Sequence, residues 1–234
     1  MKIVATIEAR MTSTRLPKKV LKNGVDKYSF LEILIYRLKQ VPELDDIVVA
    51  TTTNIDDDPI ESVAKKCNVK CFRGSEFDVL NRVLSAAKSL NADLIVETHA
   101  DAVFVSPEII SQMIQIYKYN DCEYVKNFEP NSFYNGLEVQ VFSTKLLEFI
   151  SNQVDLSEDD KEHVSKYFRD RPQQFKHLVL YAMPSHRVLD KNIKLTLDTP
   201  QDLIFIREML DKLYKKAGLL FDINDIQEVI KDGI

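Results

Sequence analysis

The sequence lacks both of the common glycine-rich phosphate loops. Neither G-x-x-x-x-G-K nor G-x-G-x-x-G occurs anywhere in its 234 residues, which contain only five glycines. These two motifs bind phosphate through closely spaced backbone amides. A nucleotide would therefore have to be bound by a different arrangement, one that relies on side chains.

The sequence also lacks a disulfide framework, an excess of basic residues and a long run of apolar residues. Cys67, Cys71 and Cys122 cannot all pair, as is typical of a reducing cytoplasm, and no second cysteine pair completes a metal site. The net charge of −5 argues against non-specific nucleic-acid binding. No apolar run reaches the roughly 18 residues of a membrane helix, and no signal peptide precedes the first strand-like segment. We expect a cytoplasmic protein without nucleic-acid or membrane partners.

Short apolar segments alternate with helical patterns in the first half of the chain. Apolar residues make up 45% of the sequence, enough for a substantial core. Strands are predicted at 3–7, 46–50, 69–72 and 93–97, and helices at 30–40, from Pro59 with Asp58 as N-cap, at 78–90 and at 107–118. Repeated βα units of this size predict an α/β fold, a three-layer, doubly wound and mostly parallel sheet.

The pattern changes after residue 120. Two strands are predicted within 122–142, helices at 144–153 and 159–170, strands at 176–182 and 192–197, and helices at 200–216 and 221–230. We interpret residues 1–234 as a single domain in which 122–170 form a small inserted α+β subdomain.

A cationic loop follows the first strand. The segment from Arg10 to Lys19 also contains Arg15, Lys18, two threonines and a serine. In open α/β sheets, ligands bind beyond the carboxyl ends of the strands, where this loop begins. Arginine binds phosphate through two parallel hydrogen bonds, and lysine adds a point charge. The loop therefore predicts a polyphosphate ligand, most simply a nucleoside triphosphate.

Two aspartates are candidates for a Mg²⁺ site. Asp101 follows the strand at 93–97, and Asp198 follows the segment at 192–197. Magnesium prefers oxygen ligands and is usually held by one or two carboxylates together with phosphate oxygens. Each residue has an alternative role, because Asp198 could cap the helix that begins at Pro200 and Asp101 could lie in a solvated loop.

The run from Ala9 to Leu21 closely resembles the opening of spore-coat polysaccharide cytidylyltransferase-like proteins, which belong to the acylneuraminate and CMP-KDO cytidylyltransferase family. Further blocks agree in order: Phe72-Arg73-Gly74-Ser75-Glu76 with Asp78-Val79-Leu80 and Arg82, then Asp101, Gly136-Leu137-Glu138-Val139, Glu162-His163-Val164 and Leu197-Asp198-Thr199-Pro200. The resemblance spans nearly the whole chain and implies a Rossmann-like, GT-A-like nucleotidyltransferase fold.

The resemblance also implies roles for individual residues. Arg10, Arg15 and Lys19 would hold the phosphates that leave as pyrophosphate, while Asp101 and Asp198 would bind Mg²⁺. Ser75 and the backbone of Ala9 would lie beside the base. The remaining predicted binding residues are Ser13, Arg73 and Arg82, together with Glu138, Glu162 and His163 at the acceptor pocket. Arg73 and Arg82 could instead only pair with nearby acids, and His163 could be structural.

The chain departs from the usual pattern of the family at several positions. The family has glutamine where Glu8 stands and glycine where Thr12 and Lys18 stand. Around Asp101 it reads Thr-Gly-Asp-Cys-Pro, whereas this chain has His99-Ala100-Asp101-Ala102-Val103. These changes leave the predicted phosphate cations and metal ligands in place.

The predicted function is Mg²⁺-dependent transfer of CMP from CTP to a sugar acid or a phosphorylated small molecule for surface glycan biosynthesis. The alternatives are the same reaction with GTP, a glycosyltransferase that uses a nucleotide sugar, and a non-catalytic nucleotide-binding homologue. The glycosyltransferase alternative would need an Asp-x-Asp motif, for which Asp56-Asp57-Asp58 is the candidate. The resemblance further implies a homodimer, with 122–170 as the expected contact region.

Overall fold

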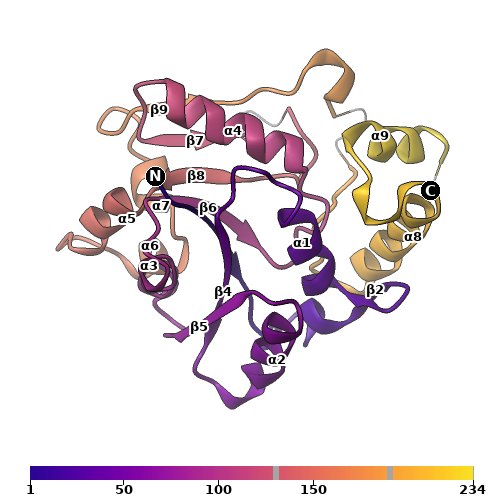
Figure 1. The fold of residues 1–234 in the computed structure, drawn as a ribbon, viewed down its shortest axis with the longest axis horizontal. Helices are drawn as coiled ribbons and strands as arrows, with labels where there is room; N and C mark the ends of the chain where they lie inside the picture. The colour runs from indigo at the N-terminus through magenta and orange to yellow at the C-terminus, as the bar shows by residue number, and fades with distance from the viewer. Residues whose placement is uncertain (129–131, 189–191, 234) are drawn as a thin grey trace.

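A seven-stranded sheet forms the centre of the molecule (Figure 1). The computed structural model describes residues 1–128, 132–188 and 192–233. In spatial order the strands are β5 (Lys70–Gly74), β4 (Asp46–Thr52), β1 (Ile3–Glu8), β6 (Leu94–His99), β8 (Gln140–Ser143), β7 (Tyr124–Lys126) and β9 (His177–Val179). Only β8 runs antiparallel to its neighbours among these strands. The predicted α/β fold with a mostly parallel sheet is confirmed.

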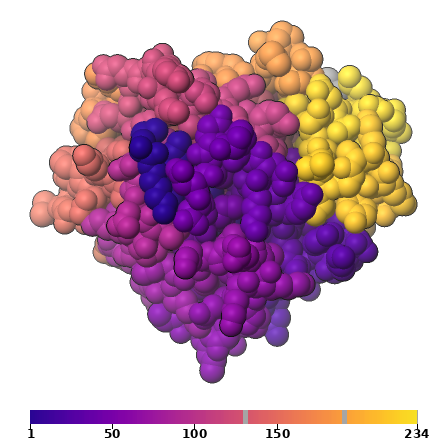
Figure 2. Space-filling view, in the orientation of Figure 1, coloured from indigo at the N-terminus to yellow at the C-terminus, as the bar shows by residue number. Residues whose placement is uncertain are grey.

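Helices cover both faces of the sheet. One face packs against α1 (Phe30–Leu38), α2 (Asp58–Lys66), α4 (Pro107–Tyr119), α8 (Pro200–Ala217) and α9 (Ile223–Lys231), and the other against α3 (Val79–Ser89), α5 (Thr144–Ser151) and α7 (Lys166–Arg169). The small hairpin of β2 (Asn23–Val25) and β3 (Tyr28–Ser29) lies beside α8. Figure 2 shows the C-terminal helices in yellow at one side of the molecule.

Strand alternation divides the core into these two layers. In β1, Ala5 and Ile7 face the α1 side, whereas Val4 faces the α3 side. Successive side chains of a strand point to opposite faces. Because Glu8 is four residues beyond Val4, it lies on the α3 face, and Glu97 and His99 lie on that same face because they follow Ile95 by two and four residues. The fold therefore directs the polar ends of both central strands towards α3.

Three predicted elements differ from the structure. The helix predicted at 159–170 is two short helices, α6 (Glu158–Glu162) and α7, separated where His163 is extended and Val164 turns into the core. Residues 192–197 form no ladder and make only an isolated bridge between Lys194 and Asn135. Their apolar pattern reflects burial of Leu195 and Leu197 beneath neighbouring loops rather than strand pairing. The predicted strand at 176–182 is reduced to β9.

The segment 122–170 is built into the main sheet. Its strands β7 and β8 extend the sheet beyond β6, and α5 packs against α3. Whether this segment also makes a dimer contact stays a prediction. All three cysteines are free. None of the described helices combines the length and the apolar character that a bilayer crossing requires.

Candidate active site

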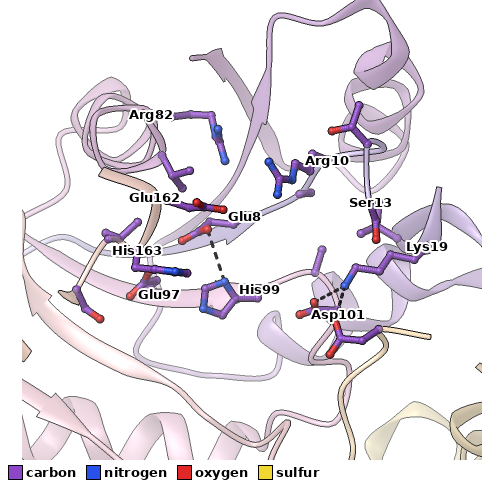
Figure 3. A pocket seen from close by; sticks show the side chains of 18 of the residues that line it. Glu8, Arg10, Ser13, Lys19, Arg82, Glu97, His99, Asp101, Glu162 and His163 are labelled. Atoms are coloured by element: carbon purple, nitrogen blue, oxygen red, sulfur yellow. Dashed lines mark hydrogen bonds and ion pairs between the residues drawn. The ribbon is translucent and has the colours of Figure 1, made fainter. Parts of the chain in front are cut away.

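A cavity of about 430 Å³ opens at the carboxyl ends of β1 and β6, bounded by α3 and the α6–α7 turn (Figure 3). The predicted site residues that line it are Ala9, Arg10, Ser13, Arg15, Lys19, Arg82, Asp101, Glu162, His163 and Asp198. Residues from five separate parts of the chain therefore meet in one place. Arg73, Ser75 and Glu138 are not among its lining residues.

The cationic loop is held in place by a buried carboxylate. The Asp57 side chain accepts a hydrogen bond of 2.7 Å from the Met11 amide and others from Thr51 and Thr52 at the end of β4. Thr12 also donates to Glu76 at 2.9 Å. Asp57 rather than Asp58 occupies the N-cap position of α2, so the predicted cap is off by one residue. Because Asp57 anchors the loop, it is not a free metal ligand of the glycosyltransferase type.

Lys19 joins the two predicted metal ligands. Its ammonium group donates to Asp101 Oδ2 at 2.6 Å, to Asp198 Oδ1 at 3.1 Å and to the carbonyl oxygen of Leu197 at 2.8 Å. Figure 3 shows Lys19 extending towards Asp101 at one end of the cavity. The carboxylates of Asp101 and Asp198, which are 97 residues apart in the sequence, thus contact the same ammonium group.

Asp198 is not the cap of the last long helix. Thr199 caps α8, because its side chain accepts from the Asp202 amide in a capping box. Asp198 instead faces Arg15, Lys19 and Lys194. Burial opposes ionisation, but hydrogen bonds from Lys194 and Lys19 outweigh it and lower the pKa of Asp198 to about 2. The carboxylate is therefore ionised at every physiological pH.

These contacts fit a divalent cation. Asp101 and Asp198 are 25% and 15% exposed, and both approach one positively charged group in a cavity open to solvent. Two carboxylates that converge on one cation match the donor set that Mg²⁺ prefers. Asp101 thus lies in the cavity rather than in a purely solvated loop.

Two arginines complete this end of the cavity. Arg15 has a side chain that is 63% exposed, and among the described residues it pairs with Asp198 alone, at 3.0 Å. Arg10 is also exposed, and its side chain makes no hydrogen bond or ion pair with the described part of the chain. Both side chains can therefore turn towards a bound anion at little cost. We call Arg10, Arg15, Lys19, Asp101 and Asp198 the charged edge.

The three predicted residues outside the lining have structural partners. Arg73 donates to carbonyl oxygens of Thr52 and Asn54 and pairs with acids on α2. The Ser75 hydroxyl accepts from backbone amides of the turn that leads into α3. Glu138 accepts from the Gly136 amide at 2.7 Å, and burial raises its pKa. A role for any of them in ligand binding stays a prediction.

Arg82 lies at the α3 wall of the cavity. It is 3% exposed, donates to the carbonyl oxygens of Ser75 and Glu76, and leaves its Nε without a partner among the described residues. Arg82 packs closely over Gly74, because a Cβ there would lie 3.0 Å from Arg82 Cγ. Burial lowers the pKa of Arg82. On the neighbouring α6–α7 turn, Glu162 and His163 are exposed, and His163 Nε2 lies 3.4 Å from Asp159 Oδ1.

Three residues at the bottom of the cavity were not predicted as site residues. Glu8, Glu97 and His99 form what we call the acidic floor, in which the Glu8 carboxylate lies 3.6 Å from His99 Nδ1. Burial raises the pKa of Glu97 well above its usual range, and the neighbouring Glu8 raises it further. Although burial opposes it, Glu8 raises the pKa of His99 to about 10.

A signal for the floor is present in the sequence. Glu97 and His99 stand two positions apart at the end of an otherwise apolar strand, so they share one face. A charged residue on the buried face of a central strand indicates a partner or a ligand. Glu8 joins them because β1 and β6 pair in a register that places it opposite His99.

Comparison with known proteins identifies the family. The sequence model of the Cytidylyltransferase family matches residues 4–226. This chain belongs to the cytidylyltransferase family. The enzymes of this family are CTP-dependent nucleotidyltransferases, and the chain is one of them.

Individual relatives cover most of this cytidylyltransferase. An uncharacterised protein of Methanocaldococcus jannaschii is 36% identical over 98% of this chain and 89% of its own length. The spore coat polysaccharide biosynthesis protein SpsF of Bacillus subtilis is 33% identical over 92% of this chain and 88% of its own length. A solved cytidylyltransferase from Leptospira borgpetersenii superimposes with a TM-score of 0.89 at 31% identity, covering 99% of this chain and 94% of that one.

Proposed function

We propose that this cytidylyltransferase transfers CMP from CTP to a sugar acid or a phosphorylated small molecule, with release of pyrophosphate, in the biosynthesis of a surface polysaccharide. The observation that carries the proposal is the contact of Lys19 with both Asp101 and Asp198 at the mouth of the cavity. The similarity to SpsF supports a polysaccharide pathway. We further propose that the protein is a cytoplasmic homodimer.

The charged edge fits the phosphates of CTP. Arg10 and Arg15 are exposed and close to Lys19, so the three cations can contact the β- and γ-phosphates through charge-assisted hydrogen bonds. When the phosphates bind, the Lys19 ammonium exchanges its carboxylate partners for phosphate oxygens. Asp101 and Asp198 are then free to hold Mg²⁺, which when bound supplies positive charge at the phosphates.

The reaction needs orientation and charge neutralisation more than covalent chemistry. An acceptor oxygen attacks the α-phosphorus of CTP, and the bond from that phosphorus to the oxygen bridging the β-phosphate breaks. Pyrophosphate leaves, and a hydroxyl acceptor also releases one proton. The cations of the charged edge stabilise the negative charge that develops on the leaving pyrophosphate. The acceptor would lie over the α6–α7 turn, next to Glu162 and His163.

Pyrophosphate release tests this proposal. Purified protein would be incubated with Mg²⁺, one nucleoside triphosphate and a panel of sugar acids and sugar phosphates. We expect release with CTP and at least one acceptor, and none without acceptor. Release with GTP alone would overturn the base assignment. Tight CTP binding without release for any acceptor would contradict the enzymatic proposal.

A further inference from the structure

The acidic floor lies beside the charged edge but is chemically different from it. Figure 3 shows Glu8, Glu97 and His99 together at one end of the cavity, with Arg10 between them and Lys19. The floor combines two carboxylates with an imidazole, whereas the two candidate magnesium ligands are both carboxylates.

Sheet register brings the three groups together. Glu97 and His99 alternate with Thr98 on β6, and Glu8 lies opposite His99 on β1. Their three ligand atoms all lie within 4.8 Å of one another. The Glu8–His99 distance of 3.6 Å exceeds that of a normal hydrogen bond. It equals the separation of about 3.3–3.6 Å between two ligands of a tetrahedral ion with bonds of about 2.0–2.2 Å.

The floor contains buried carboxyl oxygens that receive no hydrogen bond from another type of group among the described residues. Glu97 is 2% exposed, and no N–H or hydroxyl group of the described ranges donates to its Oε2 atom. The Oε1 atom of Glu8 likewise accepts no such bond. The two carboxyls instead hydrogen-bond to each other, so in the metal-free protein a proton occupies the place that a bound ion would take. Nearby arginines do not satisfy them through hydrogen bonds, because Arg82 donates to carbonyl oxygens of the β5–α3 loop and Arg169 pairs with Asp170. Buried polar groups are normally satisfied, so each such atom needs an explanation.

We propose that Glu8, Glu97 and His99 form a second metal site, which binds a divalent transition-metal ion such as Zn²⁺. Two carboxylates and an imidazole suit zinc, manganese or iron better than magnesium, which takes oxygen ligands. The ion would replace the proton that Glu97 and Glu8 share. Because all three residues line the cavity, its remaining coordination positions would face the space available to substrate. The proposal does not depend on which nucleotide or acceptor the enzyme uses.

Metal titration of the full-length protein tests the proposal. Chelator-treated protein would be titrated with Zn²⁺ by calorimetry, and with Co²⁺ by visible absorption, in excess Mg²⁺ to occupy the charged edge. We expect one Zn²⁺ per chain and the intense absorption of low-coordinate Co²⁺. Glu97→Gln and His99→Gln should each weaken binding at least about 100-fold, since even loss of an outer-shell partner costs about 10–100-fold.

Two matched variants separate the floor from the rest of the cavity. Glu162→Gln and His163→Gln remove the exposed glutamate and histidine of the neighbouring α6–α7 turn and should leave Zn²⁺ affinity unchanged. Circular dichroism and thermal unfolding would establish that each variant is folded, and Glu97→Gln keeps the shape of the side chain. The proposal is overturned if the wild type binds no Zn²⁺ under these conditions. It is also overturned if Glu97→Gln and His99→Gln bind as tightly as wild type, or if the Glu162 and His163 variants lose the ion instead.

Discussion

The charged edge and the acidic floor share one cavity but differ in how their carboxyl groups are neutralised. At the edge, carboxylates meet cations from other segments, and the resulting ion pairs keep Asp198 ionised down to a pH of about 2. At the floor, two carboxylates lie together on neighbouring strands, and burial raises the pKa of Glu97. The edge is carried by loops around the cavity, whereas the floor is carried by the sheet.

The edge residues can therefore exchange one ionic partner for another, whereas the floor carboxyls require a proton or a cation between them. Exposed ion pairs such as Arg15–Asp198 contribute little stability and can be replaced by contacts to a charged ligand. Two buried carboxyls side by side disfavour ionisation of one of them, and a bound cation would relieve this cost. We therefore expect substitutions at the edge to change catalysis most and substitutions at the floor to change stability and metal binding.

The largest effect is expected for Asp198→Asn at the edge. This change removes a charge that faces Lys19, Arg15 and the proposed cation, and loss of one well-placed electrostatic contact typically lowers kcat about 100-fold or more. Initial rates of pyrophosphate release measure the loss. Thr199→Ala is the control, because it removes the helix cap, costs about 1 kcal/mol of stability and leaves the carboxylate in place. Activity of Asp198→Asn within tenfold of wild type would contradict the assignment.

A smaller catalytic effect is expected for Arg15→Ala. The KM for CTP should rise and kcat should fall, together lowering kcat/KM by about 10–100-fold, since a charge-assisted contact contributes about 1.5–3 kcal/mol. The free energy of unfolding should stay nearly constant because the side chain is 63% exposed. Steady-state kinetics and chemical denaturation measure the two quantities. An unchanged KM and kcat would show that Arg15 does not contact the phosphates of CTP.

At the floor, Glu97→Gln should change how stability depends on pH in the metal-free protein. The pKa of Glu97 is raised in the folded state, so the folded protein keeps a proton that the unfolded chain releases above its usual value of 4.5. Wild-type stability should therefore fall as pH rises from about 4.5, and the variant should lose this contribution. The expected gain at alkaline pH is about 1–3 kcal/mol, the cost of a buried unsatisfied group.

Denaturant unfolding from pH 4 to 9 measures this difference. The opposite sign applies at the edge, where the lowered pKa of Asp198 makes stability fall as pH decreases from 3.8 towards about 2. Glu162→Gln is the matched control, because its side chain is exposed. Parallel pH curves for wild type and Glu97→Gln would show that the floor carboxyl is not perturbed by burial.

The smallest effect is expected for Lys18→Gly in the loop of the charged edge. Lys18 has a φ of 59°, which costs a residue with a side chain about 1 kcal/mol more than glycine. Because glycine also loses more entropy on folding, the net gain in stability should be at most about 1 kcal/mol, with kcat unchanged. Thermal unfolding measures the gain. Lys22→Gly, at a φ of −63°, should instead destabilise the protein.

The comparison between edge and floor also explains what the sequence could predict. The edge residues lie on loops whose residue types and spacing carry the family resemblance, so Arg10, Lys19 and Asp101 could be named before their contacts were known. The floor depends on which strand pairs with β1 and in which register, because Glu8 and His99 are 91 residues apart. Pairing of this kind is decided by the packing of the whole sheet.

The same limit applies to the fold. Strands and helices with strong apolar periodicity, such as those at 46–50 and 200–216, are present where the sequence predicts them. The predicted strand at 192–197 is absent from the ladders because Leu195 and Leu197 are buried against loops, which produces the same alternation. The spacing of apolar residues shows which side chains are buried, but it does not show which elements they pack against.

Thermal unfolding with Mg²⁺ and each of CTP, UTP, ATP and GTP tests the central claim, that the charged edge binds CTP, most directly. A ligand at about 100 times its Kd stabilises a fold by about 2.7 kcal/mol, which for a protein of this size raises Tm by roughly 5–10 °C. We predict this rise for wild type with CTP, and a much smaller one for Arg15→Ala. An equal rise in both proteins, or no rise with CTP, would contradict the account.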